Sequence, residues 1–436
     1  MFPLLLLACT TPTGAPEGMG EDTTAAAQAA GGVVFVVVDT LRADHLTDYG
    51  YARETMPSLD ARPHLVVDGF HATSSWTPPS VASIMSGLTP PHHGIRWNPS
   101  NESEQTNIPL AAPSFIEAFH DAGYSTFLST GNAFLSAENG MDAGFDLTMD
   151  EAGPEIDNAA EVTEPAEGWL GARPDDKPFF IWLQVMNPHT PLRPAAEDLG
   201  TWADLSVLPK GADGGVVPED PAFAEAYAER DAAGDAALTQ AVVDVYDETL
   251  LGVDRSVEHL MTTLHDLGRT DVLLVLTSDH GETLNETNDN SWGHGQSLRP
   301  ELTRVPLWFS GPDVVAGHLP CLSENVDLMP SIAALRSVEG PAGIDGQSIF
   351  SACRTRVGSD LWIPDNVVRY VTIEDNEWRW TKSCMTRSEY VTNAQTDPLE
   401  RTHLPTSALP DEAAWTADMD ERLADITEST GATCMW

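Results

Sequence analysis

Eight residues, Gly32-Val33-Val34-Phe35-Val36-Val37-Val38-Asp39, give the strongest structural signal in this sequence. The seven residues before the aspartate are apolar or small and do not alternate with polar ones, which is typical of a strand buried on both faces of a sheet. Such strands build α/β folds, in which ligands lie at the carboxyl ends of the strands. Asp39 stands at such an end and is a candidate ligand-binding residue, although an aspartate in a turn or helix cap has the same local pattern.

The strand signal recurs along the chain, each time followed by polar residues. Phe179–Val185 leads into Asn187-Pro188-His189, and Asp271–Thr277 leads into Ser278-Asp279-His280. Apolar residues at helical spacing and end signals predict helices between and after these strands. The predicted helices are Ser114–Ala122, Ala237–Leu267 and Asp327–Leu335.

The alternation of strands and helices predicts an α/β fold, an α/β/α sandwich around a large, mostly parallel or mixed sheet. Short strands at Arg369–Ile373, Trp378–Thr381 and Glu389–Thr392 predict a small α+β subdomain at the C-terminus. We therefore divide the chain into a leader with a flexible tether (1–31), a main domain (32–350) and a C-terminal subdomain (351–436).

The chain is strongly acidic. It carries 22 Lys and Arg against 67 Asp and Glu, a formal net charge of −45. Nucleic acids and anionic membrane surfaces are therefore not expected as partners. The sequence leaves the oligomeric state open.

The first residues resemble an export signal. Met1 to Ala8 is a short apolar run, and Leu6-Leu7-Ala8-Cys9 resembles a bacterial lipoprotein processing site with Cys9 as the lipidated residue. This pattern predicts an exported protein, either a lipoprotein of a bacterial cell envelope or an extracellular protein. A misplaced start or a buried segment remains an alternative, because the run is short and lacks a basic start.

Four further cysteines lie in the last third of the chain. In an exported protein, an even number predicts up to two disulfides, with three possible pairings. They are Cys321, Cys353, Cys384 and Cys434.

The stretch Ser74-Ser75-Trp76-Thr77-Pro78-Pro79-Ser80 contains a candidate nucleophile. Proline restricts the residue before it, so Thr77 is expected to be extended, with a helix opening near Ser80. Its hydroxyl would then lie at a helix N-terminus, where N–H groups and the helix dipole favour an anion. The alternative is an ordinary N-cap.

Several candidate residues follow strands or begin helices, and these positions converge at one edge of an open α/β sheet. Two carboxylates, an imidazole and a hydroxyl suit one divalent cation such as Zn²⁺, Mn²⁺ or Ca²⁺. A cation beside Thr77 would lower the pKa of its hydroxyl and favour attack on phosphorus or sulfur. The expected metal ligands are Asp39, Thr77, Asp279 and His280, and the expected substrate-binding residues are His189, His294, Arg96 and Asn98.

The ordered motifs from residue 32 to about 405 resemble the sulfatase branch of the alkaline phosphatase superfamily. They are Asp39-Thr40-Leu41-Arg42, Thr77-Pro78-Pro79-Ser80, His93-Gly94, Asn187-Pro188-His189, Ser278-Asp279-His280-Gly281-Glu282, Gly293-His294-Gly295, Arg304-Val305-Pro306 and Asp397-Pro398.

The resemblance implies that residues 32–350 form a sulfatase-like catalytic domain. It implies Thr77 as nucleophile, Asp39, Asp279 and His280 as metal ligands, and His189 and His294 in substrate binding or proton transfer. His93 would support the nucleophile motif, and Glu282 is expected to orient His280 or cap a helix.

The chain departs from sulfatases proper at the nucleophile. Where this chain has Thr77, these enzymes carry Cys or Ser, which is matured to formylglycine, and where it has Val81 they carry an arginine. The second acid that often follows the first metal aspartate in the family is replaced here by Thr40. No formylglycine is therefore expected, and cleavage of phosphate or phosphonate esters is slightly favoured. A sulfuric ester hydrolase working without formylglycine and a degenerate surface binding protein remain alternatives. The substrate would be a small molecule or a glycan or lipid ester.

Overall fold

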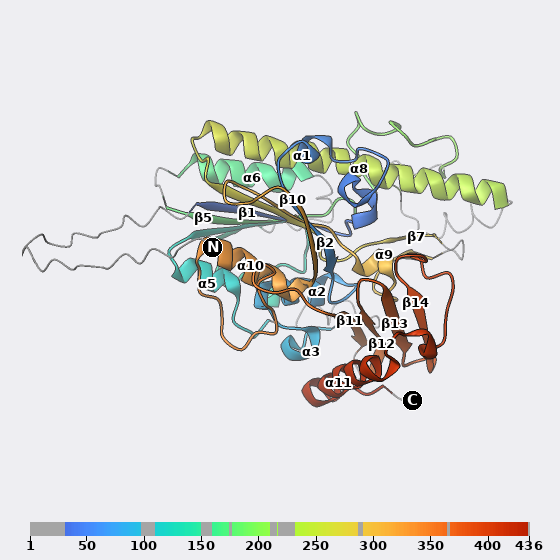
Figure 1. Ribbon diagram of the computed structural model, residues 1–436. Helices are drawn as coiled ribbons and strands as arrows, with labels where there is room; N and C mark the ends of the chain where they lie inside the picture. The colour runs from blue at the N-terminus through green and yellow to red at the C-terminus, as the bar shows by residue number, and fades with distance from the viewer. Residues whose placement is uncertain are drawn as a thin grey trace, which may run out of the picture.

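An eight-stranded sheet organises the main domain (Figure 1). The structure is a computed structural model that describes residues 31–96, 110–149, 159–173, 177–209, 216, 232–286, 291–363 and 367–434. All strands run parallel except β9, which is antiparallel to both its neighbours. The strand order is β10 (Gly317–Glu324), β2 (Leu65–His71), β9 (Leu307–Ser310), β6 (Val272–Thr277), β1 (Gly32–Val38), β5 (Phe179–Val185), β3 (Ser125–Thr130) and β4 (Leu147–Met149).

Strand β1 lies in the middle of the sheet, between β5 and β6, and is buried throughout. Its side chains alternate between two hydrophobic cores: Val34, Val36 and Val38 pack into one, and Val33, Phe35 and Val37 into the other. A strand with a core on each face needs apolar residues at every position, which explains the unbroken apolar run.

Helices cover both faces of the sheet and complete the α/β/α sandwich (Figure 1). The first core includes residues of α6 and α8, and the second includes residues of α2, α5 and α10. The predicted α/β/α architecture is confirmed. The described α-helices of the main domain are α1 (Pro57–Asp60), α2 (Thr77–Ser86), α3 (Pro90–His93), α5 (Phe115–Asp121), α6 (Ala159–Gly171), α8 (Ala232–Asp266), α9 (Pro300–Thr303) and α10 (Asn325–Arg336). The 3-10 turns are η1 (Ala43–His45), η2 (Thr47–Tyr49), η3 (Ala137–Asn139) and η5 (Thr406–Ala408). Strands β7 (Thr283–Leu284) and β8 (Trp292–Gly293) form a short antiparallel pair.

The C-terminal part forms the small subdomain that the sequence predicts. Its antiparallel sheet is covered by α11 (Glu412–Thr430), and Trp362, Trp380 and Trp415 fill the core between them (Figure 1). The strands, in spatial order, are β11 (Val357–Ile363), β12 (Val367–Glu374), β13 (Trp378–Ser383) and β14 (Ser388–Asn393).

The four C-terminal cysteines form two disulfides. Cys321 in β10 pairs with Cys353, and Cys384 pairs with Cys434 beyond α11. The first bond therefore lies in the segment that leads into the subdomain, and the second ties the chain end to its sheet.

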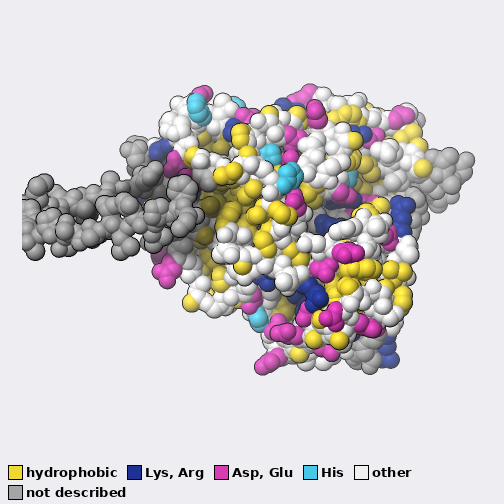
Figure 2. Space-filling model, viewed as in Figure 1, with side chains coloured by type: hydrophobic (Ala, Val, Ile, Leu, Met, Phe, Trp, Pro, Cys, Tyr) yellow, Lys and Arg dark blue, Asp and Glu magenta, His cyan; other side chains and the backbone are white. Residues whose placement is uncertain are grey.

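The surface retains the acidity of the composition. Asp and Glu side chains are distributed over both the sandwich and the C-terminal subdomain on the face seen in Figure 2. Among the described helices, none combines the length and apolarity that a bilayer crossing requires.

Candidate active site

Thr77 is the first residue of α2 and not an extended residue before it. The extended residue is Trp76, with φ −148° and ψ 139°, so the predicted helix start near Ser80 is wrong by three residues. The reason is that the first turn of a helix tolerates proline, since its N–H groups have no partner within the helix. Pro78 and Pro79 occupy that turn and leave it with few N–H donors.

Asp39 and the pair Asp279-His280 follow the neighbouring strands β1 and β6, and the structure brings them together. One ligand atom from each lies within 4.8 Å of the others, and all three residues are buried. Asp39 Oδ1 and Asp279 Oδ2 have no hydrogen-bond partner among the described residues. Two buried carboxylate oxygens without donors, beside an imidazole nitrogen, fit the requirements of a divalent cation.

The orientation of His280 follows from its backbone neighbour. Its Nδ1 lies 3.0 Å from the carbonyl oxygen of Gly281, which can only accept, so Nδ1 carries the proton. The lone pair of Nε2 therefore faces the cluster, 3.8 Å from Asp39 Oδ1 and 3.7 Å from Asp279 Oδ2. Thr77 Oγ1 lies 3.1 Å from the same nitrogen and donates to it. The predicted nucleophile is thus within reach of the predicted metal ligands.

A side chain that the sequence analysis did not single out holds Asp39. Asn132, just after β3, donates from Nδ2 to Asp39 Oδ2 at 2.8 Å. This bond occupies one carboxylate oxygen and leaves Oδ1 for the cluster. Burial, followed by the nearby charge of Asp279, raises the pKa of Asp39 well above its usual value.

His294 lies between the rings of His280 and His189 and also contacts Trp76. The His294 ring centroid is 4.5 Å from that of His280, 4.9 Å from that of His189 and 5.1 Å from the Trp76 ring. Burial lowers the pKa of His294 to about 3. The three histidines therefore form one group of imidazoles next to Thr77.

Both outer histidines have their Nδ1 atoms engaged. His294 Nδ1 lies 3.2 Å from Glu282 Oε1, and His189 Nδ1 lies 2.5 Å from the carbonyl oxygen of Thr190. The Glu282 carboxylate thus contacts His294, whereas the sequence analysis expected it to orient His280 or cap a helix. Because an oxygen acceptor fixes each Nδ1 proton, the Nε2 atoms remain available as acceptors.

The remaining candidates have different surroundings. The guanidinium of Arg96 lies 5.2 Å over the ring of Trp362 in the C-terminal subdomain. Asn98 falls outside the described residues. His93 accepts the N–H of Ile95 at Nδ1 and donates from Nε2 to Ser83 Oγ on α2, the supporting position expected for it.

Thr40 stands where the resemblance leads one to expect a second acid. Its φ of 60° is in the left-handed region, which a β-branched residue rarely adopts. Tyr246 holds this backbone in place: its hydroxyl donates to the Thr40 carbonyl oxygen at 2.7 Å and accepts the N–H of Arg42 at 3.0 Å. The Thr40 hydroxyl is buried without a hydrogen-bond partner within the described part of the chain.

Comparison with known proteins assigns the family. A family model described as Sulfatase matches residues 32–338, and the chain belongs to the sulfatase family. The predicted class, a sulfatase-like ester hydrolase of the alkaline phosphatase superfamily, agrees with this membership. The family uses a metal ion, for which the Asp39–Asp279–His280 cluster is the possible site.

Individual relatives cover most of the chain. A low-salt glycan biosynthesis sulfotransferase of Haloferax volcanii is 26% identical over 333 residues, which are 71% of this chain and 67% of the relative. A solved structure in complex with its substrate D-glucosamine-2-N,6-O-disulfate has a TM-score of 0.73 at 17% identity, covering 92% of this chain and 98% of that one. A phosphonate monoester hydrolase from Silicibacter pomeroyi has a TM-score of 0.69 at 20% identity, with 91% and 95% covered.

Proposed function

We propose that this chain is a metal-dependent hydrolase of phosphate or phosphonate esters in which Thr77 is the nucleophile. The observation that carries the proposal is the position of Thr77 Oγ1, 3.1 Å from His280 Nε2 and beside the buried carboxylate oxygens that lack donors. An unmodified threonine at this position offers an alkoxide and not the hydrated aldehyde of formylglycine sulfatases. The similarity in fold to a phosphonate monoester hydrolase supports the same class of substrate.

The proposed metal ligands are Asp39, Asp279 and His280, with the Thr77 hydroxyl beside them. A divalent cation (Zn²⁺, Mn²⁺ or Ca²⁺) held there would lower the pKa of this hydroxyl and neutralise charge on the ester oxygens. Asp39 would bind through Oδ1, because Asn132 occupies Oδ2. His280 would bind through Nε2, because Nδ1 is bonded to the Gly281 carbonyl.

The residues of the chain account for the remaining steps. Thr77 Oγ1 forms the bond to phosphorus while the bond from phosphorus to the leaving oxygen breaks. With a lone pair on Nε2, His189 and His294 are the two candidates for taking the Thr77 proton and giving it to the leaving oxygen, and the protonated ring would bind the non-bridging oxygens. Water then attacks the phosphothreonine ester and restores the hydroxyl.

A sulfuric ester hydrolase working without formylglycine is the second candidate. Family membership favours it, as does the similarity in fold to a structure holding a disulfated glucosamine. Under this reading the same Thr77 would attack sulfur, and the substrate would be a sulfated glycan or small molecule.

Hydrolysis of four nitrophenyl esters (sulfate, phosphate monoester, phosphodiester and phosphonate) separates the two candidates. The assay uses chain from residue 32 onward, loaded in turn with Zn²⁺, Mn²⁺ and Ca²⁺. Thr77→Ala removes the nucleophile and Thr77→Ser keeps a hydroxyl. Ser80→Ala is the matched control, because it also removes a hydroxyl from α2. The Ser80 hydroxyl donates to the Ser74 carbonyl oxygen and not to the cluster.

We expect phosphoester or phosphonate turnover that falls at least about 10³-fold in Thr77→Ala. Thr77→Ser should retain part of it, and Ser80→Ala should stay close to the parent. Preferential sulfate turnover would favour the second candidate. Turnover that is unchanged in Thr77→Ala would refute the nucleophile, and inactivity with every metal and ester would favour a degenerate binding protein.

We further propose that the protein is exported and tethered through Cys9. The two disulfides support an oxidising compartment, since such bonds persist mainly outside the cytosol. The lipoprotein-like leader and the tether lie outside the described residues, so mass spectrometry of the mature N-terminus is the test. An unprocessed Met1 would contradict the proposal.

A further inference from the structure

The segment 297–304, which contains α9, connects separate parts of the candidate active site. Its Leu302 carbonyl oxygen accepts the N–H of Gly281, the residue after the proposed metal ligands, at 2.9 Å. Its Ser297 carbonyl oxygen accepts the hydroxyl of Ser75, two residues before the proposed nucleophile, at 2.6 Å. The position of this segment is therefore linked to both the metal cluster and the nucleophile.

His294 belongs to the same stretch of chain, three residues before the segment begins. The segment is closely packed on the side of the metal cluster, because a Cβ atom on Gly281 would lie 2.0 Å from the Glu301 carbonyl oxygen. The two backbones are thus in direct contact. A displacement of the segment would therefore change the position of His294 relative to Thr77.

A buried arginine of the C-terminal subdomain also binds this segment. Arg379, in β13, is 1% exposed. Its guanidinium donates from Nη2 to the Leu298 carbonyl oxygen and from Nη1 to Thr303 Oγ1, the latter at 3.3 Å. Leu298 precedes α9 and Thr303 is its last residue, so one planar group binds both ends of this short helix.

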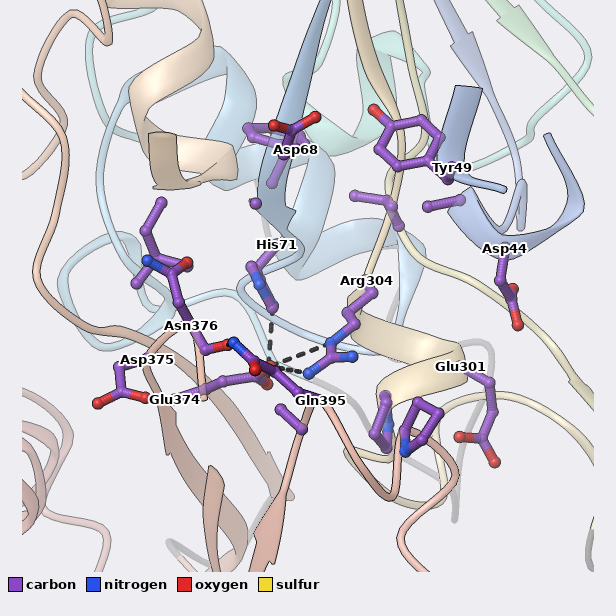
Figure 3. A pocket seen from close by; sticks show the side chains of 18 of the residues that line it. Asp44, Tyr49, Asp68, His71, Glu301, Arg304, Glu374, Asp375, Asn376 and Gln395 are labelled. Carbon is purple, nitrogen blue, oxygen red and sulfur yellow. Dashed lines mark hydrogen bonds and ion pairs between the residues drawn. The ribbon is translucent and has the colours of Figure 1, made fainter. Parts of the chain in front are cut away.

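Two carboxylates fix the orientation of this guanidinium. Glu374 accepts from Arg379 Nη1 through Oε2 and from Arg304 Nε through Oε1, the latter at 3.0 Å. Glu400 Oε1 lies 2.9 Å from Arg379 Nε. Figure 3 shows Glu374 directed from the subdomain toward Arg304 and His71 of the main domain. A guanidinium held at all three nitrogens has a single orientation, which a lysine ammonium could not reproduce.

Attachment of the subdomain to the main domain rests on other bonds as well. In β11, Asp360 donates its N–H to the Thr73 carbonyl oxygen at 2.9 Å. The neighbouring Ser359 hydroxyl donates to the Ala72 carbonyl oxygen at 2.6 Å. A buried ion pair is weak evidence for stability, since apolar residues of similar volume often serve as well. What an apolar side chain could not supply at position 379 is the pair of directed bonds to the segment 297–304.

We propose that Arg379 is a positioning residue of the active site. Through the segment 297–304 it fixes the place of His294 relative to Thr77, so the C-terminal subdomain is part of the catalytic unit. The kinetic consequence rests on the ester hydrolysis proposed above, and the structural consequence does not.

The test compares Arg379→Lys with Arg422→Lys, since lysine keeps the positive charge in both and removes the planar fork. Arg422, on α11, is the matched control. It forms a two-point ion pair with Asp360 in the same subdomain and, among the described bonds, none with the segment 297–304. One measurement is kcat and KM on the preferred nitrophenyl ester. The other is the ring signals of His294 in proton–nitrogen NMR spectra of histidine-labelled protein, assigned with His294→Gln.

We expect kcat to be about tenfold lower in Arg379→Lys, with KM within about twofold of the parent, because a small displacement of a catalytic group affects the rate more than the binding. The His294 ring signals should shift in the same variant, and neither quantity should change in Arg422→Lys. Unmoved His294 signals in Arg379→Lys, or an equal shift in Arg422→Lys, would overturn the proposal. A parent without turnover would contradict the proposed function alone, because the NMR comparison does not depend on activity.

Thr303→Val serves if Arg379→Lys does not fold. It removes one of the two acceptors on the segment and keeps the guanidinium, so the His294 signals should shift by less than in a variant that loses both bonds. Unmoved His294 signals in folded Thr303→Val protein would likewise overturn the proposal.

Discussion

Replacing Asn132 with alanine should weaken metal binding while leaving the fold intact. Asn132 is 5% exposed and held on several sides: its N–H donates to Thr130 Oγ1 at 2.9 Å, and its Oδ1 accepts the N–H of Phe134 at 2.9 Å. These bonds point Nδ2 at Asp39 Oδ2, 2.8 Å away. Among the described residues, this is the one neutral donor that keeps the carboxylate in a single orientation, with Oδ1 toward His280.

The expected magnitude follows from the role of this bond. Removing a partner that orients a metal ligand typically weakens metal binding about 10- to 100-fold, which corresponds to about 1.4–2.7 kcal/mol. The upper end is expected here, because Asp39 is fully buried and water cannot replace the lost donor.

Titration calorimetry with Mn²⁺ and Zn²⁺ measures the effect directly, without relying on activity. Asn139→Ala is the control, because Asn139 bonds to Phe134 O and Ser136 Oγ in the same loop and has no contact with Asp39 among the described bonds. Circular dichroism checks that both variants fold. Unchanged affinity in Asn132→Ala, or an equal loss in Asn139→Ala, would refute the reasoning.

Two further predictions follow from buried charges. Glu282→Gln keeps an oxygen to accept the His294 Nδ1 proton, whereas Glu282→Ala does not. The kcat on the preferred ester should therefore fall about tenfold in Glu282→Gln and further in Glu282→Ala, with KM less affected. Equal kcat values in the two variants would contradict this role. His71 and Glu374 should each contribute a loss of stability in acid, because their folded-state pKa values (about 4 and about 2) are below their unfolded values. At these two positions the unfolded chain binds more protons, at His71 as pH falls from about 6.5 to 4 and at Glu374 from about 4.5 to 2. Tm measured against pH should decline less steeply above pH 4 in His71→Asn, and an unchanged slope would contradict the assignment.

The central strands could be predicted because burial on both faces of the sheet requires a continuous run of apolar residues. Phe179–Val185 has the predicted bounds, and Val272–Thr277 differs by one residue. The two strands at the β10 edge of the sheet, β10 and β2, could not be predicted in this way. Leu65–His71 contains Asp68 and Gly69, and Gly317–Glu324 contains a proline and exposed residues, so neither has a continuous apolar run.

The ligand-bearing ends of the strands were predictable for the same reason, and the groups that orient them were not. Asp39 and Asp279-His280 follow apolar runs directly, so their position in the fold comes from the strands. Asn132 also follows a strand, yet an asparagine there is typical of any turn. Its role depends on β3 reaching the neighbourhood of β1 across β5, which only the sheet order reveals.

The proline pair after Thr77 has a consequence for the chemistry that the sequence pattern alone concealed. A helix N-terminus usually binds an anion through its free N–H groups, but Pro78 and Pro79 have none, and the Ser80 N–H is bonded to the Trp76 carbonyl oxygen. The first turn of α2 therefore offers at most the Thr77 N–H, and most of the charge on a tetrahedral ester must be stabilised by other groups. The site supplies them from outside α2: the carboxylate cluster with its affinity for a cation, and the imidazoles of His189 and His294. If this division of roles is correct, affinity for phosphate should depend far more on the metal and these histidines than on the helix that carries the nucleophile.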